Sequence, residues 1–186
     1  KWLSHRMVER GIIKEEEQEL YQFGIRNGMI LLLNVVTALV IGLLTEQLAV
    51  VAVFTLSFMV LRSYTGGYHS DSRIFCYLGS NLVLLVPVYT QAVFCKTSLA
   101  LLVSAGIIFL LSPMHSKNRK LDKEEQKHFG RKARLIAALE LAVLGILWHA
   151  GQIPYAYAVY TGICITALFM LVGKAQLWIQ PHTENR

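Results

Sequence analysis

The chain has few charged residues and few cysteines. Only 16% of its 186 residues are charged, against about 25% in ordinary soluble domains. Its three cysteines form no CxxC pair and no repeated metal spacing, and an odd number argues against a fully paired disulfide framework. A soluble domain, a disulfide scaffold and a zinc-ribbon type of module are therefore not indicated.

What the chain has instead is long apolar runs, since 54% of its residues are hydrophobic. A membrane-spanning helix needs roughly 20 apolar residues, within a range of about 17 to 25. Six segments are candidates: Gly28 to Leu44, Leu48 to Leu61, Ile74 to Cys95, Ser98 to Leu111, Leu135 to Ala150, and Tyr155 to Gly173. We predict an all-α membrane protein with six transmembrane helices.

The second and fourth of these segments are short. Each has 14 residues, which as a helix rise by roughly 21 Å. Flanking polar residues must complete them if they are to reach both interfaces. Re-entrant hairpins are the alternative for these two segments.

The sequence also predicts a division into three parts. Residues 1–27 carry apolar residues at roughly helical spacing among charged ones, so an amphipathic cytoplasmic or interfacial segment is expected. Residues 28–173 form the membrane domain. It contains one polar loop at 62–76 and a basic loop at 112–134. Residues 174–186 form a short tail.

The distribution of the basic residues predicts the topology. Cytoplasmic loops carry an excess of Lys and Arg. If six helices span the membrane and both termini are cytoplasmic, all of the 18 basic residues except Lys96 fall on the cytoplasmic side. The net charge of +6 is then a cytoplasmic basic surface, and no nucleic-acid partner is expected.

The loop at 62–76 reads "RSYTGGYHSDSRIFC". Gly66 and Gly67 allow the backbone to adopt positive φ and to approach a ligand closely. Asp71 and Ser72 are good N-cap residues, so the third apolar helix is expected to begin at Arg73. The loop therefore combines backbone freedom with the start of a helix.

Two side chains of this loop suit a cysteine protease. Cys76 is the fourth residue of the expected helix, where the positive end of the helix dipole favours a thiolate. His69 is placed to accept the thiol proton and later to protonate a leaving amine. Arg62 or the backbone N–H groups of the glycine pair are candidates to stabilise an oxyanion, and the sequence does not choose between them. Asp71 either orients His69 or caps the helix.

Two other interpretations of the loop stay open at this point. In one, the chain is a non-enzymatic transporter or scaffold protein, Arg62 and Arg73 bind an anionic group, and Cys76 only packs. In the other, His69 belongs to a metal-dependent site. Only Asp71 could join His69 and Cys76 as a ligand, which is too few for zinc. We therefore predict no metal and no cofactor.

The pattern R-x-x-x-G-G-x-H-x6-C, from Arg62 to Cys76, resembles the accessory gene regulator B (AgrB) family of membrane cysteine endopeptidases. The stretch "YQFGIRNGMILLL" (residues 21–33) is similar to that family's entry into its first span. The stretch "SPMHSKNRKLDKEEQKHFGRKAR" (residues 112–134) resembles its loop with a Pro, an Asn before basic residues, and a charged helix. Met114 and His115 depart from this pattern, because a more polar pair is expected after the Pro.

The resemblance implies residue roles. The family's catalytic residues fall on His69 and Cys76. Supporting or substrate-binding roles fall on five further residues of the two loops, and the chemistry of the first loop adds Asp71 and Arg73. The full set is Arg62, Gly66, Gly67, Asp71, Arg73, Pro113 and Asn118.

The resemblance also implies an activity and its partners. Such proteins cut a short propeptide in Gram-positive bacteria, at the cytoplasmic side of the cell membrane, and yield a cyclic quorum-sensing peptide. The propeptide is expected to carry an amphipathic leader and an acidic C-terminal tail. The acyl group held on Cys76 is expected to pass to a peptide thiol and close a thiolactone ring. The resemblance further points to a homodimer, on which no motif in the chain reports.

Overall fold

The computed structural model describes residues 2–66, 73–90, 98–114 and 122–179. These residues form seven α-helices and one 3₁₀ helix, and no strand occurs among them. By its contacts the chain divides into two compact units, residues 1–37 and residues 38–186. Each unit is described below by itself.

The first unit contains α1 (Trp2–Glu9), the 3₁₀ helix η1 (Glu15–Glu17) and most of α2 (Gln18–Leu44). Ser4 and Ile13 are buried, whereas Trp2 is exposed and lies under the Arg6 guanidinium, 4.9 Å from the ring centroid. The acidic residues of η1 are exposed. A helix therefore begins ten residues before Gly28, and the first apolar segment is its continuation.

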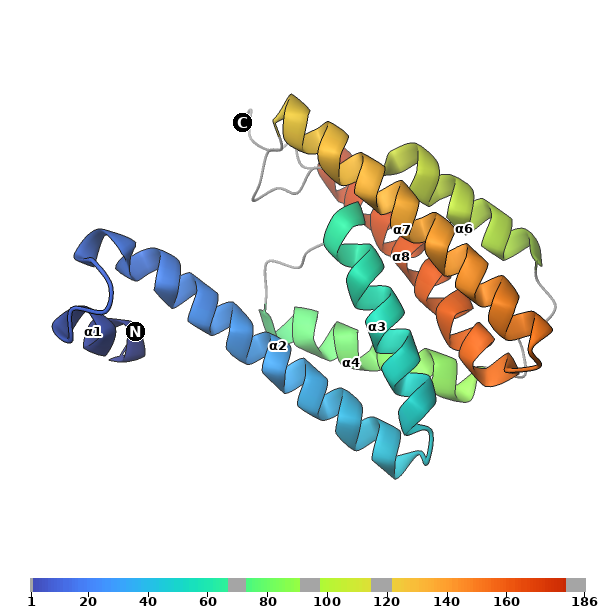
Figure 1. Cartoon of the computed structure of the whole chain (residues 1–186), viewed down its shortest axis with the longest axis horizontal. Coiled ribbons are helices and arrows are strands. Elements are labelled where there is room, and N and C mark those ends of the chain that lie inside the picture. The colour runs from blue at the N-terminus through green and yellow to red at the C-terminus, as the bar shows by residue number, and fades with distance from the viewer. Residues whose placement is uncertain (1, 67–72, 91–97, 115–121, 180–186) are drawn as a thin grey trace. The chain divides into compact units, whose positions relative to one another are not determined.

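The second unit contains the end of α2 and five further helices. These are α3 (Leu48–Thr65), α4 (Arg73–Tyr89), α6 (Ser98–Leu111), α7 (Lys123–His149) and α8 (Ile153–Ile179). Helix α8 packs against α3, α4, α6 and α7, and α3 also packs against α4 and α7 (Figure 1). Each of the six predicted apolar segments therefore lies at least partly in a helix of its own.

Three stretches are long and apolar enough to cross a bilayer: Glu15–Leu44, Leu48–Thr65 and Ile153–Gln176. Helix α3 has 18 residues because it continues beyond Leu61 to Thr65. Helix α6 has 14 residues, as predicted. The prediction of an all-helical membrane protein is thus supported. Six spans with cytoplasmic termini stay a prediction.

Helix α7 begins earlier than the fifth apolar segment that was predicted. The charged helix of the 112–134 loop and the fifth apolar segment are one continuous helix of 27 residues. The stretch from Lys123 to His149 contains no proline and mostly strong helix formers, so nothing in it ends the helix.

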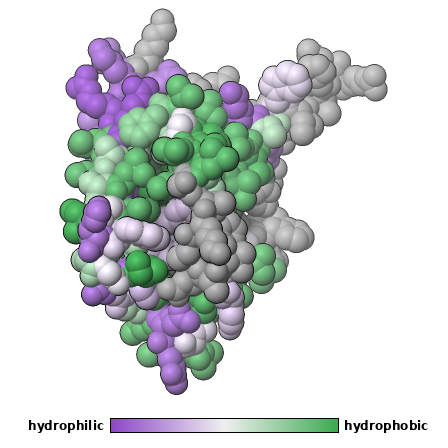
Figure 2. All heavy atoms as spheres, turned by 90° about the vertical axis from the view of Figure 1, so that its right-hand side faces the viewer, coloured by the Kyte–Doolittle hydropathy of each residue, from purple (hydrophilic) through white to green (hydrophobic). Residues whose placement is uncertain are grey.

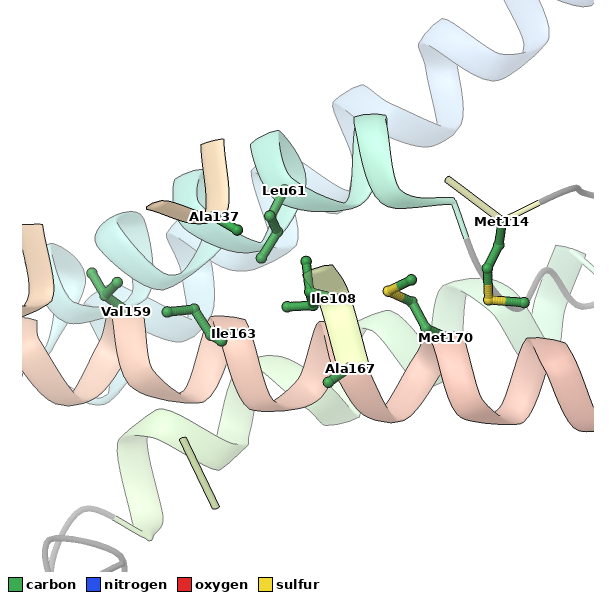
Figure 3. Packing of buried hydrophobic residues seen from close by; sticks show 8 residues of the cluster. All are labelled: Leu61, Ile108, Met114, Ala137, Val159, Ile163, Ala167 and Met170. Carbon is green, nitrogen blue, oxygen red and sulfur yellow. The ribbon is translucent and has the colours of Figure 1, made fainter. Parts of the chain in front are cut away.

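The core of the second unit contains several small residues. Ala133 and Ala137 of α7 and Ala158 and Ala167 of α8 are almost fully buried. Ala137 and Ala167 belong to one cluster with larger residues such as Leu61, Ile163 and Met170 (Figure 3), and Ala158 belongs to a second cluster with Phe54. Small residues allow helices to approach closely, which is typical of helix contacts in membranes.

The outside of these helices is apolar. Large side chains of α6 and α7 are exposed: Leu99, Leu102, Val103, Leu110, Leu135, Leu139, Val143 and Ile146. On the face shown in Figure 2, hydrophobic side chains cover a broad area, and hydrophilic ones gather mostly toward the top and bottom of the view. Soluble monomers rarely expose apolar patches of this extent. This surface fits contact with lipid.

Candidate active site

The candidate site begins where α3 ends. Thr65 is fully buried, and its carbonyl oxygen accepts the N–H of Met114 at 2.9 Å. Gly66 follows with φ 72° and ψ −154°, and its N–H bonds the carbonyl of Arg62 at 3.2 Å. That backbone conformation is essentially restricted to glycine. The helix therefore stops at Gly66 because this residue turns the chain sharply away.

Gly66 also makes a close approach to the second loop. A Cβ atom at this position would lie 2.7 Å from the carbonyl oxygen of Met114, which is far inside a normal contact distance. Met114 itself is buried and points toward α8, where Met170 belongs to the same cluster (Figure 3). The glycine predicted to give backbone freedom thus allows two loops that lie almost 50 positions apart in the sequence to touch.

The same loop contacts α7 through Pro113. A Cβ atom on Gly130 would lie 2.9 Å from Cδ of Pro113. Ser112, just before it, is buried and donates its hydroxyl to the carbonyl of Ile108 at the end of α6. Residues 112–114 therefore fill the space between the end of α3 and the first half of α7. The structure thus brings Gly66 beside Met114 and Pro113 beside Gly130.

Arg62 is held by aromatic rings. Its guanidinium carbon lies 4.7 Å from the ring centroid of Phe169 on α8 and 5.8 Å from that of Phe58 on α3. Both distances are within the range of cation–π attraction. The two rings are themselves 5.9 Å apart. Arg62 therefore has a defined position at the end of α3.

The first half of α7 adds basic residues beside this site. The ring of Tyr64 lies 6.2 Å from the ring of Phe129, and Nζ of Lys132 lies 5.8 Å from the centroid of the Tyr64 ring. Four basic residues of this half are exposed: Lys127, Arg131, Lys132 and Arg134. We refer to these four residues as the basic face of α7.

The predicted catalytic pair falls only partly within the described residues. The described part of α4 begins at Arg73, and Cys76 is the fourth residue of α4 as described. The structure describes the backbone of Arg73 and Cys76 but not their side chains. Gly67, His69, Asp71 and Asn118 lie outside the described residues. A dyad of His69 and Cys76 therefore stays a prediction.

One polar contact was not among the predicted site residues. Glu140 is the only Asp, Glu, Lys or Arg within the six predicted apolar segments. Its Oε2 accepts a hydrogen bond of 2.9 Å from the hydroxyl of Ser57 on α3. A charged residue in an apolar run is a signal for a functional position, and the amino-acid sequence alone carries it. Within the described part of the chain, no three His, Cys, Asp or Glu side chains group as metal ligands do.

A bundle of apolar helices with small residues inside, large apolar residues outside and a polar site at one end defines a helical membrane protein. The family model of accessory gene regulator B, AgrB, matches residues 1–171, and the chain belongs to this family. The resemblance noted from the two loops is thereby confirmed. Proteins of this family are known generally for processing autoinducer propeptides.

Two curated relatives are similar over part of their length. AgrB-like protein 2 of Clostridium perfringens strain 13 and an AgrB-like protein of Clostridium perfringens strain SM101 are each 25% identical to the chain over 131 residues. The alignments cover 64% of this chain and 61% of each relative. No solved structure matches the chain.

Proposed function

We propose that this protein is an integral-membrane cysteine endopeptidase that cuts an autoinducer propeptide and cyclises the part it retains. The observation that carries the proposal is membership of the AgrB family over residues 1–171, which include both loops. The packing of Gly66 against Met114 supports it, because the two loops that hold the proposed functional residues meet there.

The proposed reaction starts with the Cys76 thiolate, formed when His69 takes the thiol proton. The thiolate attacks a peptide carbonyl, and the C–N bond of the resulting tetrahedral intermediate breaks. His69 returns its proton to the departing amine, so a C-terminal fragment leaves and an acyl thioester remains on Cys76. The position of Cys76 in the first turns of α4 supports this role, because the helix dipole favours a thiolate there.

Cyclisation follows by exchange of one thioester for another. A thiol within the bound peptide attacks the carbonyl held on Cys76, its proton passes to His69, and the Cys76 thiolate leaves. One C–S bond forms as another breaks, so the acyl group stays activated as long as water is excluded. The exchange therefore needs no energy source and no cofactor beyond the chain itself. A site at the edge of the bilayer helps to exclude water.

Arg62 is proposed to stabilise negative charge on the peptide carbonyl oxygen. Its guanidinium is oriented by Phe58 and Phe169 at the same end of α3 as Gly66. An oriented donor stabilises developing charge better than a mobile one, because it needs no reorganisation during the reaction.

The basic face of α7 is proposed to attract the acidic tail of the propeptide. Complementary charge mainly raises the rate of encounter and selects the partner. The proposal places this face and the active site on the cytoplasmic side of the cell membrane of a Gram-positive bacterium. Anionic lipid headgroups would also be attracted to this face.

The central test uses protein reconstituted in vesicles and a synthetic peptide with an amphipathic leader, one internal cysteine and an acidic tail. Cys76→Ser and, separately, His69→Ala should abolish cleavage, whereas Cys95→Ser and Cys164→Ser should retain it. Mass spectrometry of the wild-type reaction should show a C-terminal fragment and a retained segment that is lighter than its linear acid by the mass of a water molecule. Full cleavage by either Cys76→Ser or His69→Ala would disprove the dyad.

A second measurement separates the enzyme from a transporter or scaffold. At pH 7, Cys76 should react with a thiol reagent much faster than Cys95 and Cys164, and His69→Ala should slow that reaction. Equal rates for the three cysteines would favour a Cys76 that only packs.

A further inference from the structure

The position of Glu140 calls for a physical explanation. Glu140 lies near the middle of the fifth apolar segment, and its side chain is partly buried between helices. An ionisable side chain is costly in such surroundings and is usually kept for a reason. The proposed peptide chemistry at the end of α3 does not use it, because Glu140 lies ten residues beyond Gly130, or about 15 Å along α7.

Glu140 connects three helices. Its partner Ser57 is only 8% exposed and donates its hydroxyl at 2.9 Å. On the other side of Ser57 lies Gly162 of α8, where a Cβ atom would approach the Ser57 hydroxyl to 2.7 Å. The absence of a side chain at Gly162 therefore leaves room for the hydroxyl. Helices α3, α7 and α8 meet at this one polar contact.

Both α3 and α7 run from the Ser57–Glu140 contact to the candidate site. On α3, Ser57, Leu61 and Thr65 follow each other at four-residue spacing, so they share one face. Leu61 and Thr65 are fully buried, and Thr65 bonds Met114 at the site. A displacement of α3 at Ser57 is therefore carried to Thr65 and Gly66 by one continuous helix.

The fully buried positions of α7 between Gly130 and Glu140 hold only small residues. Gly130, Ala133, Ala137 and Glu140 follow at spacings of three and four, and the first three are buried. Alanine and glycine permit close approach but do not fill a specific hole, so such a face specifies register poorly. In a bilayer the hydrophobic effect does not drive one apolar helix against another, so packing and hydrogen bonds must set the alignment.

From this arrangement we propose that the Ser57–Glu140 hydrogen bond fixes the register of α3 against α7 and thereby positions the Arg62–Gly66 end of the candidate site. Ser57 and Glu140 are positioning residues. A slip by one helical turn would move the end of α3 by about 5.4 Å and would separate Thr65 from Met114. The effect on catalysis rests on the proposed function, whereas the effect on register does not.

The register is measured without any substrate. Tyr64→Cys and Phe129→Cys replace two rings whose centroids are 6.2 Å apart, in a background where the three native cysteines are serine. A short bifunctional methanethiosulfonate reagent then links the two positions in detergent-solubilised, monodisperse protein. The rate of crosslinking reports how α3 and α7 are aligned at the site.

Four variants are compared in this assay. Ser57→Ala and Glu140→Leu should lower the rate of crosslinking by roughly three- to twentyfold, the range that corresponds to one interhelical hydrogen bond in a membrane. Glu140→Gln should stay close to the parent rate, because an amide oxygen accepts the same hydrogen bond. Thr55→Val is the matched control on α3, since the Thr55 hydroxyl bonds the carbonyl of Val51 in its own helix.

Each outcome decides the proposal. A parent rate in either Ser57→Ala or Glu140→Leu would overturn it, because each change removes the hydrogen bond. A rate in Glu140→Gln as low as in Glu140→Leu would also overturn it, because charge and not a hydrogen bond would then hold the helices. If Glu140→Leu does not fold, Ser57→Ala carries the same test with the loss of a single oxygen atom.

The catalytic consequence is measured separately with native cysteines and the synthetic peptide described above. Ser57→Ala should lower kcat for cleavage with little change in KM, and Thr55→Val should change neither. If even the parent protein does not cleave the peptide, the proposed function fails while the crosslinking result stands. If the parent cleaves and Ser57→Ala cleaves with the parent's kcat, the positioning role fails while the proposed function stands.

Discussion

The two ends of the helices of the second unit are built differently. At the end away from the site, the turns between α2 and α3 and between α7 and α8 are closed by backbone bonds: Gln47 N–H to Gly42 at 2.9 Å and Gln152 N–H to Leu147 at 2.9 Å. At the site end, α3 is joined to residues 112–114 and to α7 by contacts between residues far apart in the sequence. One end is fixed locally and the other by tertiary contacts.

The local turns share one geometry. Glu46 and Gly151 have φ of 56° and 73°, and each is followed by a residue whose N–H reaches back five positions. This left-handed cap is a common way to end a helix. Neither turn contains Lys or Arg, whereas the site end carries the basic face of α7. Reversing the chain at these two turns therefore requires few specific residues, whereas the site end requires specific residues on several helices.

The largest expected difference between the ends comes from replacing their glycines. Gly66→Ala should lower the free energy of unfolding by about 3 kcal/mol or more, because it adds a strained backbone and a Cβ clash with a backbone oxygen. Gly151→Ala should cost about 1 kcal/mol, since its φ is positive but no atom lies within 4 Å of the added Cβ. Thermal unfolding in detergent measures both. Equal losses would mean that the contact with Met114 does not matter.

Two glycines within α7, Gly130 and Gly145, allow the same comparison to be made inside one helix. Gly130→Ala should destabilise the protein by about 1–3 kcal/mol, because its Cβ would press on Pro113. Gly145→Ala should stabilise it by up to about 1 kcal/mol, since no atom lies within 4 Å and alanine favours the helix. Opposite signs in the same helix are the expected result of the same unfolding measurement. A gain in stability at Gly130 would contradict the tight fit of the second loop.

The two aromatic rings that contact the Arg62 guanidinium, Phe58 and Phe169, should affect activity more than stability. Phe169→Leu removes one ring from the guanidinium and should lower kcat for cleavage by roughly two- to thirtyfold, which corresponds to a cation–π contact of about 0.5–2 kcal/mol. Phe169→Trp should retain most of the activity. Phe109→Leu, at an exposed position of α6, serves as the control. Equal activity of Phe169→Leu and wild type would remove the positioning role of this ring.

The smallest effect is expected at the end away from the site. The hydroxyls of Thr90 and Tyr157 are 2.6 Å apart and join the end of α4 to α8. Tyr157→Phe should cost about 1 kcal/mol of stability and leave the kinetics of cleavage unchanged. A clear fall in kcat would show that the two ends are coupled through α8.

The helices were largely predictable from the sequence, because runs of apolar residues specify them locally. Leu111 was placed correctly as the end of α6. The length of α3 was underestimated, because the apolar run ends at Leu61 while the helix needs the polar residues that follow to reach Gly66. The charged helix and the fifth apolar segment were expected to be separate. They form one helix, because a change in polarity does not by itself end a helix.

The roles of the candidate site residues stay a prediction, whereas the contacts of the described ones could not be derived from the sequence. The glycine pair and Pro113 were marked by the family pattern, yet the meeting of Gly66 with Met114 depends on packing between distant segments. Met114 was noted as a departure from the expected polarity, and its burial against α8 explains why an apolar residue is suitable there. Glu140 stands out in the sequence as the one acidic residue in six apolar runs, whereas its partner Ser57 is identified only by the fold.

The length of α6 has a consequence for the membrane around the site. Its 14 residues rise by about 21 Å, against roughly 30 Å for the hydrocarbon of a typical bilayer. If α6 spans, the lipids beside it must thin, because tilting would only increase the mismatch. Residues 112–114 follow α6 directly and would then lie in a depression of the leaflet. A peptide lying flat on the membrane would sink toward the end of α3 without having to leave the headgroup region.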